Sequence, residues 1–276
     1  MSLRPAVFGR QGWYPDNPTR CAEALQAFAS RSPDDTAALE TDAVRVAGLV
    51  PHAGWFFSGD LATWTFAALA RGLLSPDLVW IFGGHLLPGD SAVCMSEGSW
   101  ETPFGPVAVN EDLGKRFAEE FPCVTESPER FQPDNTIELQ MPILKYFWPE
   151  ARVVAIGVPP DDMAGAIGQW AAQQSEAAGL SSLAIGSTDL THYGANYGFE
   201  AKGSGAAALR WAREENDAPF IEHLLRLDGA GAIAHARERQ SACCAGAAAA
   251  AVAFAKARGA QAGRLIAQTT SHDKEP

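Results

Sequence analysis

Short apolar runs alternate with longer segments of helical spacing along most of the chain. The runs are rich in Val, Ile and Leu and are bounded by turn residues, which is the pattern of strands buried in a sheet. They predict strands at residues 44–50, 78–82, 153–158, 183–186 and, near the C-terminus, 265–268. Residues 98–109 contain a Pro/Gly turn and predict a hairpin.

The segments between these runs have the length and apolar spacing of helices, and several open with Asp, Ser or Pro near the first turn. They predict helices at residues 21–30, 60–73, 111–120, 137–147, 163–178, 203–215 and 219–226. The alanine-rich tract 245–257 has near-maximal helix propensity, and we expect it to form a buried helix.

Strands that alternate with helices are typical of βαβ units, in which crossover helices join parallel strands. The sequence therefore predicts an α/β fold with a mainly parallel or mixed central sheet flanked by helices. Its 276 residues lie within the reach of one large domain, and they show neither an internal repeat nor a linker. We expect residues 1–276 to form a single domain.

Composition limits the kinds of binding partner and the cellular location that we expect for this protein. Apolar residues make up 47% of the chain, which is enough for a packed core. A net charge of −12 without a basic stripe argues against nucleic acid and anionic membrane as partners. The first residues lack the apolar segment of a secretory signal, and no stretch has the length of a membrane span, so we expect a cytoplasmic protein. Its five cysteines lack CxxC spacing and are expected to be reduced.

Four polar residues follow predicted strands. His52 follows the first strand, His85 the second, and Asp189 and His192 the fourth. In an open parallel sheet, loops at the carboxyl ends of the strands line a shared crevice, so we expect these side chains to converge. A single histidine in such a loop is more often only a hydrogen-bonded loop residue.

Three histidines at equivalent positions, each near glycine, favour a ligand site over that alternative. Imidazoles and a carboxylate at one point can bind a divalent metal ion. Cys243 and Cys244 precede the alanine-rich helix, where the macrodipole favours a thiolate, so either could add a ligand. The residues alone do not choose between these two cysteines.

Eight short motifs occur in order along most of the chain. They are GWYPD at 12–16, PHAGWFFSG at 51–59, GGH at 83–85, ETPFG at 101–105, NTIELQMPIL at 135–144, STDLTHYG at 187–194, LDG at 227–229 and ACCAG at 242–246. Together they resemble the Memo family, which includes bacterial members of the AmmeMemoRadiSam gene association. The family in turn resembles LigB-type class III extradiol dioxygenases, which hold non-haem Fe(II) with two histidines and a carboxylate.

Memo proteins have cysteine in place of that carboxylate. The resemblance therefore implies a LigB-like fold in which His52 and His85 are metal ligands. It implies Cys243 as the third ligand, because the family pattern reads Cys-Gly and Cys244 stands at the glycine. Asp189 and His192 match pocket residues, with His192 at the position of the acid/base of the ring-cleaving relatives.

The resemblance also implies that Trp13 forms an apolar wall of the pocket. Trp55 and Phe57 stand where the family has tyrosines, which makes the rim more apolar, and Asn135 replaces a family histidine. Glu138 is either a helix-capping carboxylate or an outer partner of the pocket. The tail stops where relatives usually continue into a further strand. We therefore expect an edge of the sheet to be either missing or supplied by another subunit in an oligomer.

We read the other three histidines, at positions 223, 235 and 272, as surface residues. The expected function is a metal-dependent redox enzyme with dioxygenase-like chemistry, in which His192 moves a proton and Asp189 orients it. Fe(II) is the favoured ion, with copper and zinc as alternatives, and the partner is a small molecule or a peptide. The competing hypotheses are metal or ligand binding without turnover and hydrolysis at zinc.

Overall fold

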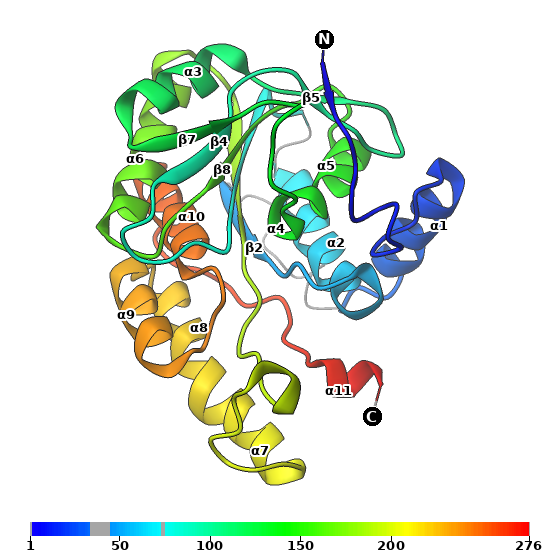
Figure 1. Ribbon diagram of the computed structural model, residues 1–276, viewed down its shortest axis with the longest axis vertical. Helices are drawn as coiled ribbons and strands as arrows, with labels where there is room; N and C mark the ends of the chain where they lie inside the picture. Colours follow the sequence, from blue (N-terminus) through cyan, green and yellow to red (C-terminus); the bar gives the residue numbers. More distant parts are fainter. Residues whose placement is uncertain (1, 34–44, 73–74, 276) are drawn as a thin grey trace.

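The fold is built on a six-stranded mixed sheet, in a computed structural model that describes residues 2–33, 45–72 and 75–275 (Figure 1). In spatial order the strands are β2 (Ala47–Val50), β9 (Ser182–Ser187), β3 (Leu78–Gly83), β8 (Arg152–Gly157), β4 (Ala92–Met95) and β7 (Cys123–Glu126). Every neighbouring pair is parallel except β8 and β4. The predicted α/β class with a mainly parallel or mixed sheet is confirmed.

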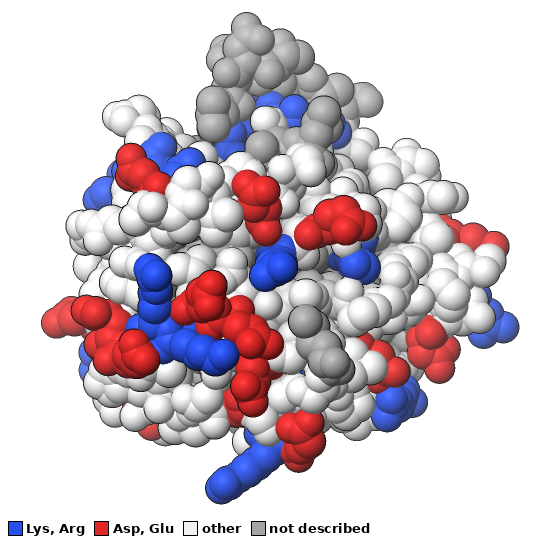
Figure 2. Space-filling model, turned by 90° about the horizontal axis from the view of Figure 1, so that it is seen from above, with Lys and Arg blue, Asp and Glu red and all other residues white. Residues whose placement is uncertain are grey.

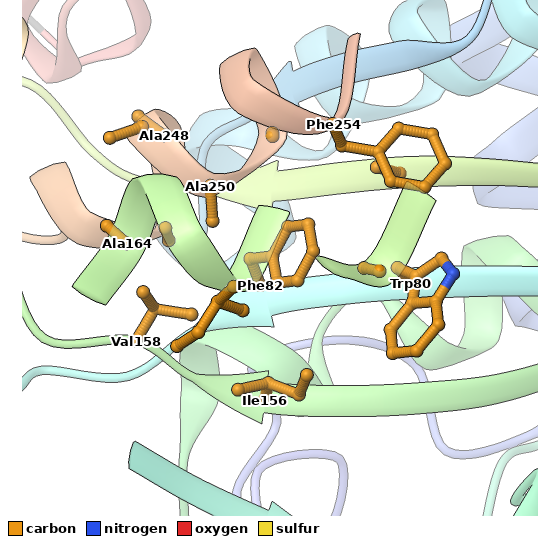
Figure 3. Packing of buried hydrophobic residues seen from close by; sticks show 14 of the residues in the cluster. Trp80, Phe82, Ile156, Val158, Ala164, Ala248, Ala250 and Phe254 are labelled. Carbon is orange, nitrogen blue, oxygen red and sulfur yellow. The ribbon is translucent and has the colours of Figure 1, made fainter. Parts of the chain in front are cut away.

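Helices cover both faces of this sheet (Figure 1). The core on one face contains side chains of α3 (Glu111–Glu120), α6 (Asp162–Ala177), α8 (Ala218–Leu225), α9 (Gly229–Arg239) and α10 (Ala245–Ala257). The core on the other face contains side chains of α1 (Pro18–Ala29), α2 (Trp55–Gly72), α4 (Asn135–Glu138) and α5 (Met141–Phe147). Successive residues of β3 alternate between these two cores. Trp80 and Phe82 belong to the core that contains α10 (Figure 3), whereas Ile81 belongs to the core on the opposite face.

The alanine-rich helix α10 lies in the core, as its composition predicts. Most of its alanines are buried, and Phe254 belongs to the same buried cluster as Trp80 (Figure 3). Small side chains let neighbouring backbones come close: a Cβ atom on Gly168 of α6 would lie 2.0 Å from the carbonyl oxygen of Ala250. The helix pair α6 and α10 therefore depends on glycine at this crossing.

The helix predicted at residues 137–147 is two helices in the structure. Helix α4 ends at Glu138 and α5 begins at Met141. Pro142 has no N–H to donate to the carbonyl of Glu138, so the α-helical ladder is interrupted there. The interruption turns Gln140 toward the sheet, where its side-chain amide donates to the carbonyl oxygen of Pro51 at 3.0 Å.

A second, three-stranded sheet contains the predicted hairpin. Its strands are β1 (Leu3–Arg4), β5 (Ser99–Trp100) and β6 (Val107–Ala108), with β5 and β6 antiparallel. The Arg4 guanidinium lies between the rings of Trp100 and Phe131 and forms an ion pair with Glu126. These contacts attach the N-terminal strand to the main body of the protein.

Other expectations are wrong. Residues 265–268 form no strand; they line a cavity opposite β2 instead of pairing with it, and Leu265 is exposed. The helix expected at 203–215 begins later, as α7 (Ala206–Trp211), because Gly203 and Gly205 have positive φ angles. It then continues through a π-helical stretch, Ala212–Asp217, into α8, where Pro219 has no N–H to donate.

Strands β4 and β7 and helix α9 were not predicted, since the two strands are short and the helix is rich in glycine and alanine. The predicted positions Val44 and Leu73 lie outside the described residues. The remaining elements are the short helix α11 (Ser271–Lys274) and a 3₁₀ turn at Ala195–Tyr197. None of the described helices is both long and apolar enough to cross a membrane.

On the face shown in Figure 2, basic side chains lie among acidic ones. The ion pair of Lys115 with Glu111 on α3 and that of Arg10 with Glu101 are examples of such mixed pairing. Water and salt screen exposed pairs of this kind, so these two ion pairs matter little for stability.

Two glycines of α6 allow a matched test of the close helix pair. We expect Gly168→Ala to lower the free energy of unfolding by about 1–3 kcal/mol, because the added methyl group overlaps the backbone of α10. Gly165→Ala, three residues earlier, meets nothing within 4 Å and should raise stability by up to about 1 kcal/mol through helix propensity. Urea unfolding of both variants measures the difference, and equal stabilities would contradict this packing.

Candidate metal centre

The carboxyl ends of four strands bring the predicted residues together. Val50 of β2 lies level with Ser187 of β9, and Gly83 of β3 lies level with Gly157 of β8. The loops that carry His52, His85 and Asp189 therefore leave the sheet side by side. The N-terminus of α10 comes to the same edge, since a Cβ atom on Gly246 would lie 2.4 Å from the carbonyl oxygen of Val158.

Two imidazoles and two thiols form a tight cluster at this edge. One donor atom from each of His52, His85, Cys243 and Cys244 lies within 4.8 Å of the others. The Cys243 sulfur is 3.3 Å from Nε2 of His52, and the Cys244 sulfur is 3.4 Å from Nδ1 of His85. The two rings are nearly perpendicular, with centroids 5.1 Å apart. Among the described residues, this cluster is the one set of histidine or cysteine donors close enough together to hold a metal ion.

The ring nitrogen that points away from the thiols has a partner in each histidine. Nδ1 of His52 lies 3.1 Å from the hydroxyl of Ser187, and Nε2 of His85 lies 3.2 Å from Oδ1 of Asn135. Such outer partners fix the tautomer and the direction of a metal-ligating imidazole. Nε2 of His52 and Nδ1 of His85 are therefore the nitrogens available to a ligand.

Asn135 has a second contact that the sequence did not reveal. Its amide group donates to the backbone carbonyl of His52 at 3.1 Å while its oxygen faces His85, so one side chain joins both histidine loops. The loss of the family histidine at this position left its role open. Asp134, which caps the N-terminus of the short helix α4, is the sequence feature that could have indicated this role, because it places Asn135 at the sheet edge.

Asp189 lies between two imidazoles. Its Oδ1 accepts the backbone N–H of His52 at 2.7 Å, and its Oδ2 lies 3.8 Å from Nε2 of His52 and 3.7 Å from Nε2 of His192. Burial opposes the charged form, but the rings of His52 and His192 outweigh this effect, so the pKa of the carboxyl lies below its usual range.

The charge of Asp189 acts in turn on His52, which is 1% exposed. Desolvation alone would lower the pKa of this imidazole, but Asp189 and Cys243 raise it to about 9. The hydrogen bond with Cys243 also raises the pKa of the exposed His85. A cation that binds these nitrogens has to displace protons, so its affinity depends on pH.

The two neighbouring thiols differ in character. Hydrogen bonds from Cys244, His52 and His85 lower the pKa of Cys243 despite its burial, so Cys243 is the thiolate of the pair. The same hydrogen bond, together with burial, raises the pKa of Cys244. The sequence comparison favoured Cys243 over Cys244, but the structure brings both sulfurs to the histidines.

His192 faces away from the cluster toward a cavity. Its ring stacks on Tyr197 with centroids 4.8 Å apart, and both residues line a cavity of about 1440 Å³ between α2, β2, α8 and the C-terminal tail. The buried carboxylate of Asp217 accepts the backbone N–H of Thr191 at 3.1 Å and thereby holds the loop that carries His192. The cavity reaches the cluster of His52, His85, Cys243 and Cys244 through Thr188 and Asp189.

The three other predicted pocket residues have partners outside the cluster. Trp13 is 37% exposed, packs on Phe8 and accepts the backbone N–H of Trp55 with its carbonyl oxygen. The Trp55 ring is buried in the core that covers one face of the sheet. Glu138 is buried and accepts three backbone N–H groups from residues 7–9 and the hydroxyl of Tyr14, so its carboxylate attaches the N-terminal loop.

Two histidines expected at the surface are half-buried. His223 lies 2.8 Å from the carboxylate of Asp228 at the N-terminus of α9, and His235 lies 2.8 Å from the buried hydroxyl of Ser241. Both histidines are half-buried because α8 and α9 pack against each other. Their charged neighbours in the sequence had instead suggested exposed positions. His272 in the tail is exposed, as expected.

Comparison of the sequence with known proteins shows the family to which the chain belongs. The sequence profile of the Memo-like proteins matches residues 4–276. A MEMO1 family protein of Pyrococcus abyssi is 30% identical over 281 aligned positions, which cover 99% of this chain and 94% of the relative. A MEMO1 family protein of Methanopyrus kandleri is 29% identical, with coverage of 99% and 93%. The chain belongs to the Memo-like family.

Among solved structures, an uncharacterized protein of Escherichia coli K12 covers 68% of this chain and 80% of its own length. Its sequence identity is 13% and its TM-score is 0.41, so it defines no function for this chain.

Proposed function

We propose that this protein is a metal-dependent redox enzyme whose ion is held by His52, His85 and Cys243. The observation that supports this function is the meeting of imidazole and thiol donors from distant segments within 4.8 Å of one another. The free nitrogens of both histidines face the thiols, and their other nitrogens have outer partners. This is the arrangement expected of metal ligands, not of loop histidines.

The donor set fits the ions that the sequence suggests. Neutral imidazole binds iron, copper and zinc, and thiolate adds negative charge and affinity for softer ions. Cys243 is already the thiolate of the pair, so it can act as a ligand at neutral pH. Fe(II) remains the favoured ion of this proposal, with copper as the alternative that also carries electrons. Zinc has no redox chemistry and fits only hydrolysis or binding without turnover.

A bound iron or copper ion would supply electron transfer and Lewis acidity. The protein would supply the proton. Nε2 of His192 faces Asp189, whose charge would orient and stabilise the protonated ring, so His192 would accept or donate the proton at its other ring nitrogen, Nδ1. Stacking on Tyr197 limits the motion of the His192 ring. The substrate would be a small organic molecule that enters the adjoining cavity.

A second candidate, metal binding without turnover, also has a specific observation in its favour. Cys244 places a second sulfur beside the predicted three ligands, and structural metal sites have four protein ligands whereas catalytic sites keep one position open. Oxygen uptake by the iron-loaded protein in the presence of candidate substrates would favour the enzyme, and its absence with a tightly held ion would favour binding alone.

His85→Ala tests the proposed ligands with little risk to the fold, because this side chain is exposed. We expect the variant to lose metal retention after anaerobic purification while unfolding at the same urea concentration as the wild type. His52→Ala should also lose the metal, although removal of this buried ring should lower stability as well. Elemental analysis by mass spectrometry measures both losses.

His192→Ala is the matched control, since its ring also lies beside Asp189 but outside the group of four donors. It should retain the metal at the wild-type level. Full metal content in folded His85→Ala protein would exclude this site as the metal centre.

Asn135→Ala removes the side chain that joins the two histidine loops. We expect metal affinity to fall about 10- to 100-fold, the usual effect of losing an outer partner of a ligand. Competition with a chromogenic chelator measures the affinity, and Asn196→Ala, at an exposed position of the cavity, serves as the control. Unchanged affinity in Asn135→Ala would mean that the histidines hold their positions without this bridge.

A further inference from the structure

We propose that Cys244 is a fourth metal ligand, so that the centre has two imidazole and two thiolate donors and binds a tetrahedral, thiophilic ion such as Zn²⁺. This inference rests on the proposed metal centre, not on its redox activity, and adds a ligand to that centre. The sulfur of Cys244 lies 3.4 Å from Nδ1 of His85, as near to that ring as the Cys243 sulfur is to His52.

The spacing of the donors fits a single tetrahedral ion. Zn–S bonds of about 2.3 Å and Zn–N bonds of about 2.0–2.1 Å separate sulfur and nitrogen by roughly 3.6 Å across a tetrahedral angle. The two measured sulfur–nitrogen distances are 3.3 and 3.4 Å. No two of the four donor atoms are more than 4.8 Å apart. The most distant pair therefore has to approach by only about 1 Å for all four atoms to bind one ion.

The backbone holds Cys244 in place for this role. Its N–H donates to the hydroxyl of Thr188 at 3.1 Å, and the residue forms the N-cap of α10. The N–H of Cys243 donates to the carbonyl oxygen of Asp189 at 3.2 Å. Both cysteines are therefore attached to the loop after β9, and the Cys244 side chain, 2% exposed, faces the cluster and not solvent.

The second thiolate changes what the centre can hold. Two thiolates neutralise the charge of a divalent ion in this partly buried position, and a tetrahedral set of two sulfurs and two nitrogens is characteristic of zinc. The proton on Cys244 is released when the ion binds. Four protein ligands would leave no open position on the ion for a substrate while Cys244 is bound.

Cobalt(II) is the probe for this inference, because it replaces zinc and its visible and near-ultraviolet absorption reports the geometry and the number of thiolate ligands. The reduced wild-type chain, titrated anaerobically with Co²⁺, should show intense tetrahedral d–d bands and thiolate-to-cobalt charge transfer. We expect Cys244→Ser and Cys244→Ala to lose about half of the charge-transfer intensity. Competition between Co²⁺ and Zn²⁺ should show their zinc affinity reduced at least about 10-fold, the lower end of the loss for an outer partner.

Cys123→Ser is the matched control, as this half-buried cysteine lies outside the cluster. Wild-type spectra and zinc affinity in both folded Cys244 variants, together with losses in Cys243→Ser, would overturn the fourth ligand and leave the three-ligand centre intact. Absence of any cobalt binding by the wild type, or wild-type binding by Cys243→Ser and His85→Ala, would overturn the proposed centre itself.

Discussion

The parallel pairing of β2, β9 and β3 is the constraint on which the rest of the structure depends. These three neighbouring strands end level with one another, with Val50 beside Ser187 and Phe82 beside Gly186. A shift of one residue in either pairing would turn buried side chains toward the opposite core and move the following loop by about 3.3 Å. Because both faces of the sheet are packed with large apolar side chains, such a shift is costly, and the loops after the strands meet at a defined place.

Hydrogen bonds between those loops then hold the polar groups of the site in place. Asp189 accepts the backbone N–H of His52, Asn135 connects the two histidine loops, and Thr188 accepts the backbone N–H of Cys244. Each bond joins segments far apart in the sequence, and each satisfies a group that would be expensive to leave unpaired in a buried position. The cluster is thus arranged by its supporting contacts as much as by the four side chains that could bind an ion.

The sequence predicted the strands of the parallel core and the convergence of His52, His85 and Asp189, because apolar runs followed by polar loop residues are local signals. It predicted the buried helix at 245–257 with its observed bounds, since alanine composition leaves little choice. It failed where the structure depends on contacts between distant segments. The roles of Asn135 and Thr188, the closeness of Cys244 to His85, and the burial of His223 and His235 come from loop packing that no periodicity encodes. The apolar run at 265–268 has strand propensity, yet it faces a cavity in place of a neighbouring strand.

Asp189 divides the site into two sides with different chemistry. On one side are the two thiols and the ring of His85, which is exposed and offers a direct path from solvent for an ion. On the other side His192 and Tyr197 line the large cavity, where an organic molecule could bind without passing the thiols. The carboxylate lies within 4 Å of both His52 and His192, at 3.8 and 3.7 Å. A change of charge at the ion would therefore reach His192 through Asp189, because in this partly buried setting charges that close interact by about 4 kcal/mol before screening. In the proposed enzyme, this coupling would make the proton affinity of His192 depend on whether the cluster holds an ion, and it would link that ion to a substrate in the cavity.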